Sequence, residues 1–453
     1  MKYKNILQVL PVLAVISLST TGCKFEQEDL FDETASLRLT HQNDKIKSRL
    51  VEQSKDGKYG WVIQYHVAGT DELSFEGFNL LGRFYADKKV TLASDHRYLR
   101  DGNSGKYTEY TSTYNMLQEE GPVLSFDTWS DILTVFEDPV DPSKAPGSLI
   151  ENGEGMFGDH NLIFQAMDGQ TIQFCGQRHR ASVRFVPCDR PWQQYLNDTK
   201  ALKSKVANST LTSYYVICKT DTMYFVGLNK GLIVYGERVY DPLIRKNLSC
   251  VFTPSGFRIE HEDTISGVTF QEFNVTPDSS ALVSLDGQVR VIPCWDSYMT
   301  THTAIWGMDP SLFSAEQQSL MSQLNTEIAK YNANWSIKSI GFGKSTGGGA
   351  VNGLVVTFYV DTAKSKTNTV GMVMAQKRVA YGQIELDVAD SPKVDNNMTA
   401  IAKKAANLTS LVQQFANTLK GRYSVTPNDF FLPTGGTYTP VAGGTSFAMS
   451  AAQ

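Results

Sequence analysis

The sequence predicts a mainly β protein with an α+β C-terminal region, in which the N-terminal domains are antiparallel barrels or sandwiches with flanking helices. Three observations lead to this prediction. Short runs of alternating apolar and polar residues recur along most of the chain, and Gly, Pro and Asp turns separate them. Long amphipathic helices gather in the last third. The 453 residues are 41% hydrophobic and 20% charged, which is enough apolar material for about two to four domains.

The first 22 residues predict a lipoprotein signal peptide. Lys2 and Lys4 precede a short apolar stretch, and small residues then lead to Cys23. Cleavage before Cys23 frees its thiol and its amine for acylation, and several acyl chains anchor a protein more firmly than one. We therefore expect Cys23 to carry a lipid anchor. The alternative is an ordinary secretory signal that a cysteine happens to follow.

Residues 23–35 predict an acidic tether, because a polar stretch rich in Glu and Asp cannot pack a core. Loss of Lys2 and Lys4 with the signal moves the formal net charge from −5 to −7. A mildly acidic chain has no electrostatic reason to bind nucleic acid or anionic lipid, so we expect neither as a partner.

The pattern divides the remaining chain into three regions. Residues 36–190 hold one helix and then a series of strands, which predicts a β-rich domain. A helix that opens at Pro191 marks a boundary, so residues 191–300 form a second β-rich module. Residues 301–453 predict an α+β domain.

Within this last region, Ser314 is a typical N-cap and opens a helix to about Tyr331. A second long helix is predicted from about residue 398 to 419, with apolar residues along one face. The tail after Pro433 is rich in Gly, Thr and Ser and is expected to be partly loose.

Several motifs resemble one known family. They are Ser36–Leu39, Gly60–Tyr65, Gly121–Thr128, Phe136–Pro139, Gly158–Phe164, Gly169–Pro187 and Gly231–Tyr235. Over about residues 30–260 the chain is similar to the lipoprotein family catalogued as domain of unknown function four-three-zero-two. The resemblance implies a Bacteroides-type surface lipoprotein encoded beside an outer-membrane nutrient-uptake system, with an uptake receptor and other lipoproteins as partners. It attaches no activity and no catalytic residue.

The acidic run behind Cys23 is similar to the export signal of such surface lipoproteins. The resemblance therefore implies an outer-membrane protein that is lipid-anchored and faces the cell exterior.

Five cysteines follow Cys23, and two of them flank a predicted hairpin. The runs at 171–174 and 183–186 have the composition of paired strands, and the turn between them would set Cys175 and Cys188 opposite each other. We therefore predict a possible Cys175–Cys188 disulfide. Two buried free thiols are the alternative, since cysteine packs as a small apolar residue.

No catalytic motif is complete. The segment around Ser446 resembles the nucleophile region of subtilisin-like proteases, but no matching Asp or His motif precedes it. The run Gly343-Lys344-Ser345-Thr346 lacks the earlier glycine that a phosphate loop needs. Neither His-Glu-x-x-His nor Cys-x-x-Cys occurs, so we expect no metal centre, no cofactor and no catalytic residue.

Trp129, Asp159 and His160 are the candidate ligand-binding residues. Trp129 is one of many aromatic residues, whose faces often hold sugars and peptides. Asp159 and His160 would form a polar site with His179 if the strands bring them together. The structural alternatives are core filling for the aromatic residue and a local hydrogen bond for the histidine.

These observations favour a non-enzymatic surface protein that helps a nutrient-uptake system to capture a peptide or glycan. Two alternatives stay open. One is an envelope hydrolase that uses two carboxylates from the acidic loop residues between Glu119 and Asp141. The other is an adhesive or scaffolding subunit that binds a protein partner through a flat apolar patch.

Overall fold

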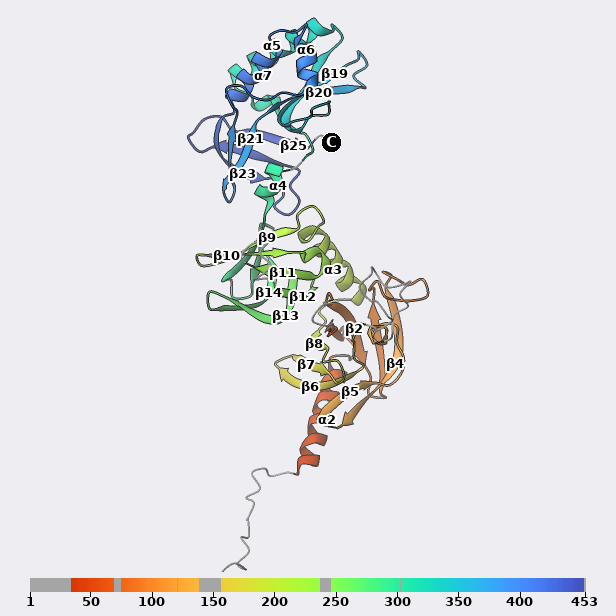
Figure 1. Cartoon of the computed structure of the whole chain (residues 1–453). Coiled ribbons are helices and arrows are strands. Elements are labelled where there is room, and N and C mark those ends of the chain that lie inside the picture. Colours follow the sequence, from red (N-terminus) through yellow and green to blue (C-terminus); the bar gives the residue numbers. More distant parts are fainter. Residues whose placement is uncertain are drawn as a thin grey trace, which may run out of the picture.

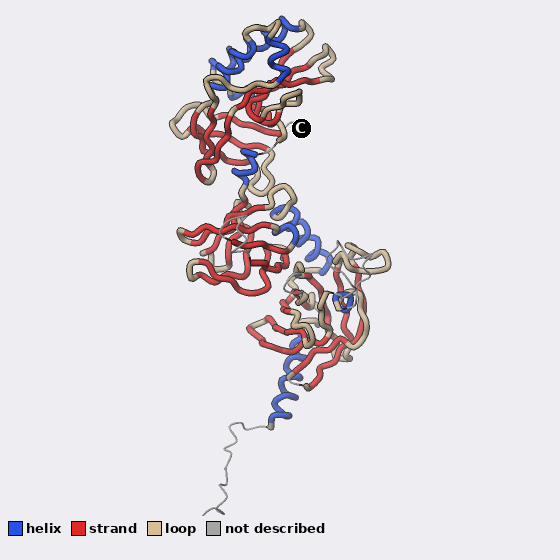
Figure 2. Tube along the Cα trace, in the orientation of Figure 1, coloured by secondary structure: helices blue, strands red, loops and turns tan. Residues whose placement is uncertain are grey.

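The computed structural model describes residues 34–68, 75–119, 121–137, 156–236, 246–301 and 303–451. These residues form three bodies in a row: two closed antiparallel barrels and a nine-stranded sheet that carries helices (Figures 1 and 2). The predicted fold class, mainly β with an α+β C-terminal region, is confirmed. The predicted signal segment 1–22, Cys23 and most of the predicted tether lie outside the described residues.

The first barrel is a meander of eight strands that closes on itself. Its strands are β1 (Trp61–His66), β2 (Phe78–Phe84), β3 (Lys89–Ser94), β4 (Thr108–Gln118), β5 (Pro122–Phe126), β6 (Asn161–Asp168), β7 (Thr171–Gly176) and β8 (Ser182–Pro187). Each strand pairs with the next, and β8 returns to pair with β1. Trp61, Ile63 and Tyr65 occupy every second position of β1 and are buried in the core, as strand geometry requires.

Helix α2 (Ala35–Glu52) closes one end of this barrel. Thr34 caps the helix by accepting a hydrogen bond from the backbone N–H of Leu37. Ile46 and Leu50 are buried in the barrel core. The indole N–H of Trp61 donates to the Leu50 carbonyl at 3.0 Å, which fixes the end of the helix on the first strand.

The second barrel repeats this order of one helix followed by eight strands. Helix α3 (Trp192–Val206) leads into β9 (Ser213–Cys218), β10 (Asp221–Val226), β11 (Leu232–Gly236), β12 (Lys246–Phe252), β13 (Gly256–Ile265), β14 (Val268–Val275), β15 (Leu282–Ser284) and β16 (Val289–Pro293). The barrel closes where β16 pairs with β9. Val206, the last residue of α3, is fully buried in this core.

Both barrel interiors are filled with side chains. In the second barrel, Phe257 and Phe273 stack with ring centroids 4.9 Å apart, and Phe225 packs edge-on against both. In the first, Phe84 packs edge-on against Tyr114 at 5.0 Å. An eight-stranded barrel is just wide enough either to be filled in this way or to hold one small ligand. Here the side chains take that space.

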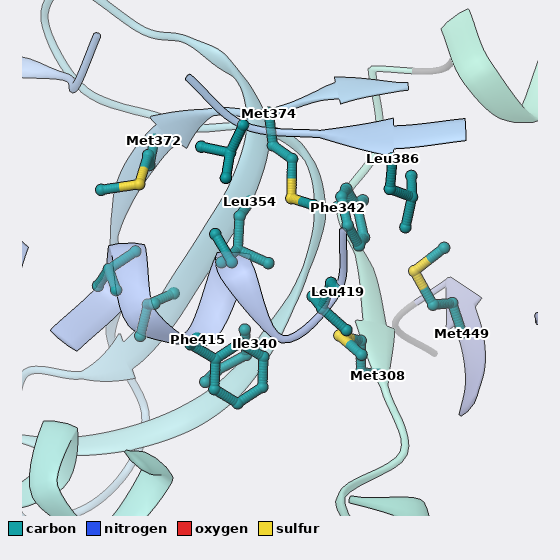
Figure 3. Close-up of a cluster of buried hydrophobic side chains, with 14 of the residues drawn as sticks. Met308, Ile340, Phe342, Leu354, Met372, Met374, Leu386, Phe415, Leu419 and Met449 are labelled. Carbon is teal, nitrogen blue, oxygen red and sulfur yellow. The ribbon is translucent and has the colours of Figure 1, made fainter. Parts of the chain in front are cut away.

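The third body is a sheet with the order β20-β19-β18-β17-β25-β24-β23-β22-β21. Its strands are β17 (Trp306–Met308), β18 (Ser336–Lys344), β19 (Asn352–Tyr359), β20 (Thr367–Val373), β21 (Ala375–Ala380), β22 (Gln383–Asp387), β23 (Gly421–Pro427), β24 (Gly435–Pro440) and β25 (Phe447–Ala451). Its helices are α4 (Trp295–Thr301), α5 (Ala315–Tyr331), α6 (Asn396–Ala402) and α7 (Leu408–Asn417). Figure 3 shows part of the core, where Phe415 of α7 and Leu419 join Ile340, Phe342 and Leu354 from the sheet.

The helix predicted from Ser314 to Tyr331 is confirmed. It begins with a capping box, in which Ser314 accepts from the Gln317 N–H and the Gln317 side chain accepts from the Ser314 N–H. The helix predicted from 398 to 419 is instead two helices, α6 and α7. Glu327 of α5 accepts a hydrogen bond from the Asn407 N–H at 3.1 Å, directly before α7, and so a new helix starts there.

The prediction of a partly loose tail after Pro433 is wrong. β25 lies inside the sheet, between β24 and β17. Tyr438, Phe447 and Met449 are buried and join the core. These few apolar residues are enough to order a segment rich in Gly and Thr, because the neighbouring strands satisfy its backbone groups.

The predicted Cys175–Cys188 disulfide is also wrong. All five described cysteines are free thiols. The β7–β8 register places Cys175 opposite Ser182, whereas Cys188 follows the far end of β8. Burial raises the pKa of both thiols, which keeps them protonated.

Candidate functional site

The loops of the first barrel differ greatly between its two ends. At the end closed by α2, the described residues of the connections are the short segments 85–88, 119, 121 and 169–170. At the opposite end, they are 67–68, 75–77, 95–107, 127–137, 156–160 and 177–181. Binding residues are most often found on long loops held by a rigid scaffold, and the mouth of a barrel is a common location. This long-loop end is therefore our candidate site.

Trp129 lies on the longest of these loops and exposes 46% of its surface. The guanidinium carbon of Arg100 lies 5.0 Å from the centre of the indole, a cation–π contact. Asp131 fixes Arg100, because its carboxylate accepts the Arg100 backbone N–H at 2.8 Å and approaches the guanidinium at 3.7 Å. The exposed indole is thus supported by two neighbouring loops.

A second exposed aromatic residue, Tyr110, lies nearby on β4. Tyr110 exposes 46% of its surface and pairs with Leu92, whose side chain is in the core, so the phenol lies on the inward face of β4, over the barrel mouth. Thr128 holds the Trp129 segment against β4 by accepting the Thr113 N–H at 3.1 Å and by bonding the Ser112 hydroxyl at 2.5 Å. Trp129 and Tyr110 therefore belong to one rim.

Asp159 has a structural role. It is only 3% exposed, and its carboxylate accepts the backbone N–H groups of Arg178, His179 and Ala181 at 2.8–3.2 Å. The Asp159 carboxylate fits here only because residue 176 is a glycine, since an added Cβ at Gly176 would overlap it. Asp159 thus fixes the 177–181 turn to the longest loop, and its acceptor sites are already used.

The structure brings His179, but not His160, to Asp159. The Nδ1 atom of His179 lies 3.8 Å from the Asp159 carboxylate and donates to the Gly158 carbonyl at 2.8 Å, whereas His160 bonds Glu137. In the described ranges no group of three or more His, Cys, Asp and Glu gathers as it would around a metal ion. His160 keeps 38% of its side chain exposed, so it remains accessible at the same end of the barrel as Trp129.

Arg100 is the rim residue that sequence reasoning missed, whereas Tyr110 is one of the many aromatic residues behind the predicted ligand binding but was not singled out. Tyr110 lies in a strand pattern, where alternation predicts which residues share a face but not where the barrel mouth leaves one uncovered. Arg100 lies in a loop, and no local pattern links it to Trp129.

In the part of the chain that the structure describes, no helix is both long and apolar enough to cross a membrane.

Comparison with known proteins gives one family. Residues 27–277 match the family described as Domain of unknown function (DUF4302), which covers the first barrel and most of the second. This confirms the resemblance that the sequence motifs indicate. No curated protein matches the chain.

Among solved structures, the C. crescentus beta sliding clamp aligns with 11% identity over 91% of this chain and 96% of the clamp. The TM-score is 0.12, so the alignment supports neither a shared fold nor a shared function.

Proposed function

Since this chain belongs to the DUF4302 family, to which no function is attached, we propose from its own residues that it is a non-enzymatic surface protein that captures a peptide or glycan. A lipid on Cys23 would hold it in the outer membrane, facing the cell exterior, where it would serve a nutrient-uptake receptor and partner lipoproteins. The observation that carries this proposal is the exposed Trp129 indole, supported by Arg100 at the long-loop end of the first barrel.

Chemistry at this rim favours capture over hydrolysis. A glycosidase needs two carboxylates about 5–9.5 Å apart across a cleft, one of them ready to transfer a proton. The described carboxylates of the predicted acidic cluster are engaged elsewhere: Asp131 with Arg100, Glu137 with His160, Asp127 with Asn115, and Glu119 with Gln177. An exposed aromatic face, in contrast, holds a sugar ring or a peptide side chain without any proton transfer.

Trp129→Ala is expected to remove ligand binding without unfolding the protein. The side chain is half exposed, so its loss leaves no buried cavity, whereas a bound ring loses its stacking surface. We suggest measuring binding of a panel of oligosaccharides and short peptides by titration calorimetry. Affinity for any binder is expected to fall about tenfold or more, which corresponds to the loss of one aromatic contact.

Tyr85→Ala is the matched control. Tyr85 is 38% exposed on the same barrel, but it lies at the end that α2 closes. Equal losses in the two variants would contradict a site at the rim. Turnover of a panel compound by the purified chain would favour the hydrolase instead.

The anchor is tested separately. With Cys23→Ser there is no thiol to acylate, so the protein is expected to move from the membrane fraction to the soluble fraction. Immunoblotting of fractionated cells measures this change, and labelling of intact cells with a protease or biotin reagent shows whether the protein faces outward. Retention of Cys23→Ser in the membrane would overturn the lipid anchor while leaving the Trp129 site untouched.

A further inference from the structure

One arginine between the two barrels is buried without a partner. Arg258 of β13 is 9% exposed and lies opposite Glu272 of β14 in the strand register. The Glu272 carboxylate nevertheless pairs with Arg184 of β8, in the first barrel, at 3.5 Å. Among the described residues, the Arg258 guanidinium has neither a hydrogen bond nor an ion pair. Because buried arginines are normally paired, this guanidinium is available to an anion from outside the chain.

The Arg258 guanidinium is also accessible. In the described ranges, some side-chain nitrogens are both enclosed and unpartnered, as Arg83 Nε is, but no nitrogen of Arg258 is among them. An unpartnered nitrogen that is not enclosed keeps contact with solvent. Since Arg258 lines a pocket of about 280 Å³, its donors open into this pocket.

The pocket lies where the two barrels meet (Figure 1). Arg184 comes from β8 of the first barrel, and the other lining residues come from β13, β14, β15 and the turn after β15 of the second. At about 30 Å³ per molecule of liquid water, the pocket has room for several waters or for one small organic ligand.

One carboxylate of the pocket is free as well. Glu272 pairs with Arg184, and Asp286 accepts three hydrogen bonds at the end of β15, at 2.5–3.1 Å. Glu262 is exposed and has no hydrogen bond or ion pair within the described residues. The pocket thus offers one free positive group, Arg258, and one free negative group, Glu262.

The surroundings of Arg258 disfavour its positive charge. Burial and then the nearby Arg184 lower the pKa of Arg258 to about 10, so the group is still charged at neutral pH. Glu272, Glu262 and Glu260 offset these two effects only in part. A ligand carboxylate would supply the compensation, because it matches a guanidinium with two parallel hydrogen bonds.

The two free groups are spaced for a small ligand. Arg258 and Glu262 are four positions apart on β13, which is about 13 Å along a regular strand. Both side chains are long and line the same pocket, so they can hold opposite ends of one molecule. Leu285 lines the pocket too and is 68% exposed, which adds an apolar surface.

We propose that this pocket binds a small zwitterion, namely a free amino acid or a short peptide with an apolar side chain. The ligand carboxylate accepts from Arg258, the ligand ammonium donates to Glu262, and the apolar side chain packs on Leu285. This is a second site, formed by both barrels and separate from the Trp129 rim.

The test is saturation-transfer NMR on the purified full chain with leucine, dileucine, N-acetylleucine and leucinamide. N-acetylleucine has no ammonium and leucinamide has no carboxylate, so the set separates the two charged contacts. Leucine or dileucine is expected to bind, and both blocked derivatives are expected to bind about tenfold more weakly or less. The comparison of leucine with dileucine distinguishes a free amino acid from a peptide.

Arg258→Met removes the guanidinium and keeps an unbranched apolar chain in place of the arginine stem. It is expected to fold, because it removes a buried charge that has no partner. Binding of the zwitterion is expected to weaken between about tenfold and a hundredfold, since a hydrogen-bonded charge pair is lost.

Glu262→Gln is the second variant, and it carries the test alone if Arg258→Met does not fold. Glu262 is exposed, so its replacement tests the contact with the ammonium without touching a core. Arg290→Met is the matched control, because Arg290 is an exposed arginine of the same barrel that lies outside the pocket.

Weaker zwitterion binding in Arg258→Met or Glu262→Gln, with Arg290→Met unchanged, supports the site. Three results would overturn it: no binding of leucine or dileucine, binding of N-acetylleucine as tight as that of leucine, or zwitterion binding that neither variant weakens. Loss of that binding in Trp129→Ala alone would place the ligand at the rim instead. Failure of this site leaves the Trp129 proposal standing, since neither variant touches that rim.

Discussion

Asp296→Ala is expected to loosen the junction between the second barrel and the C-terminal body. Asp296 is fully buried at the start of α4. Its carboxylate accepts the Arg378 guanidinium at 2.7 Å and the Gly382 N–H at 3.1 Å, both from the β21–β22 hairpin. Arg378 in turn lies over the Tyr215 ring of β9, 4.9 Å from its centre. One carboxylate therefore ties the hairpin to the barrel.

Removing that carboxylate leaves the part-buried Gly382 N–H unpaired and a half-buried guanidinium without its partner. Such a loss costs on the order of 3 kcal/mol in the free energy of unfolding. Urea unfolding measures the total effect, and hydrogen exchange at residues 375–387 shows whether it is centred on the hairpin.

Glu385→Gln is the control for Asp296→Ala. Glu385 is on the same hairpin, but its ion pair with Arg422 is exposed and should contribute less than about 1 kcal/mol. If Asp296→Ala is no more destabilising than Glu385→Gln, the junction does not depend on this carboxylate.

The protein is expected to lose stability between pH 6.5 and pH 4 because two histidines are buried in the neutral form. Burial lowers the pKa of His66 to about 3, with Arg258 and His261 of β13 adding positive charge nearby, and lowers the pKa of His96 to about 4. In the unfolded chain both titrate near 6.5. As the pH falls below 6.5, the unfolded chain binds protons that the folded chain cannot bind. The free energy of unfolding therefore falls.

The expected loss from pH 7 to pH 4.5 is about 2–3 kcal/mol for each histidine, since one pKa unit corresponds to about 1.4 kcal/mol. Urea unfolding at the two pH values measures it. His66→Asn keeps a polar atom close to the position of Nδ1, opposite Ser249, and does not titrate, so it should remove about half of the pH dependence. His41→Gln, at an exposed position of α2, should leave the dependence unchanged. A flat pH profile in the parent chain would contradict neutral burial of both rings.

Local patterns predicted much of the secondary structure but not how the strands close into barrels. The alternation at 61–66 predicts β1, and the Ser314 cap predicts the start of α5, because both depend on neighbours in sequence. The return of β8 to β1 joins residues more than a hundred positions apart, and no local pattern contains it. The Cys175–Cys188 error has the same origin, since the register of a hairpin is set by side-chain burial across strands and not by the spacing of cysteines.

The candidate site was predictable only in part. Trp129 could be named from its residue type, but its exposure and its contact with Arg100 depend on how two long loops fold against each other. Asp159 could also be named, yet its carboxylate serves three backbone N–H groups that come from a separate turn.

Helix α2 and the nine-stranded body lie at opposite ends of the row (Figure 1). Along this row the first barrel and then the second separate α2 from the nine-stranded body. If the chain is held by its N-terminal side with the row extended, a particle too large to pass beside the row therefore meets the body with α5 and α7 before either barrel.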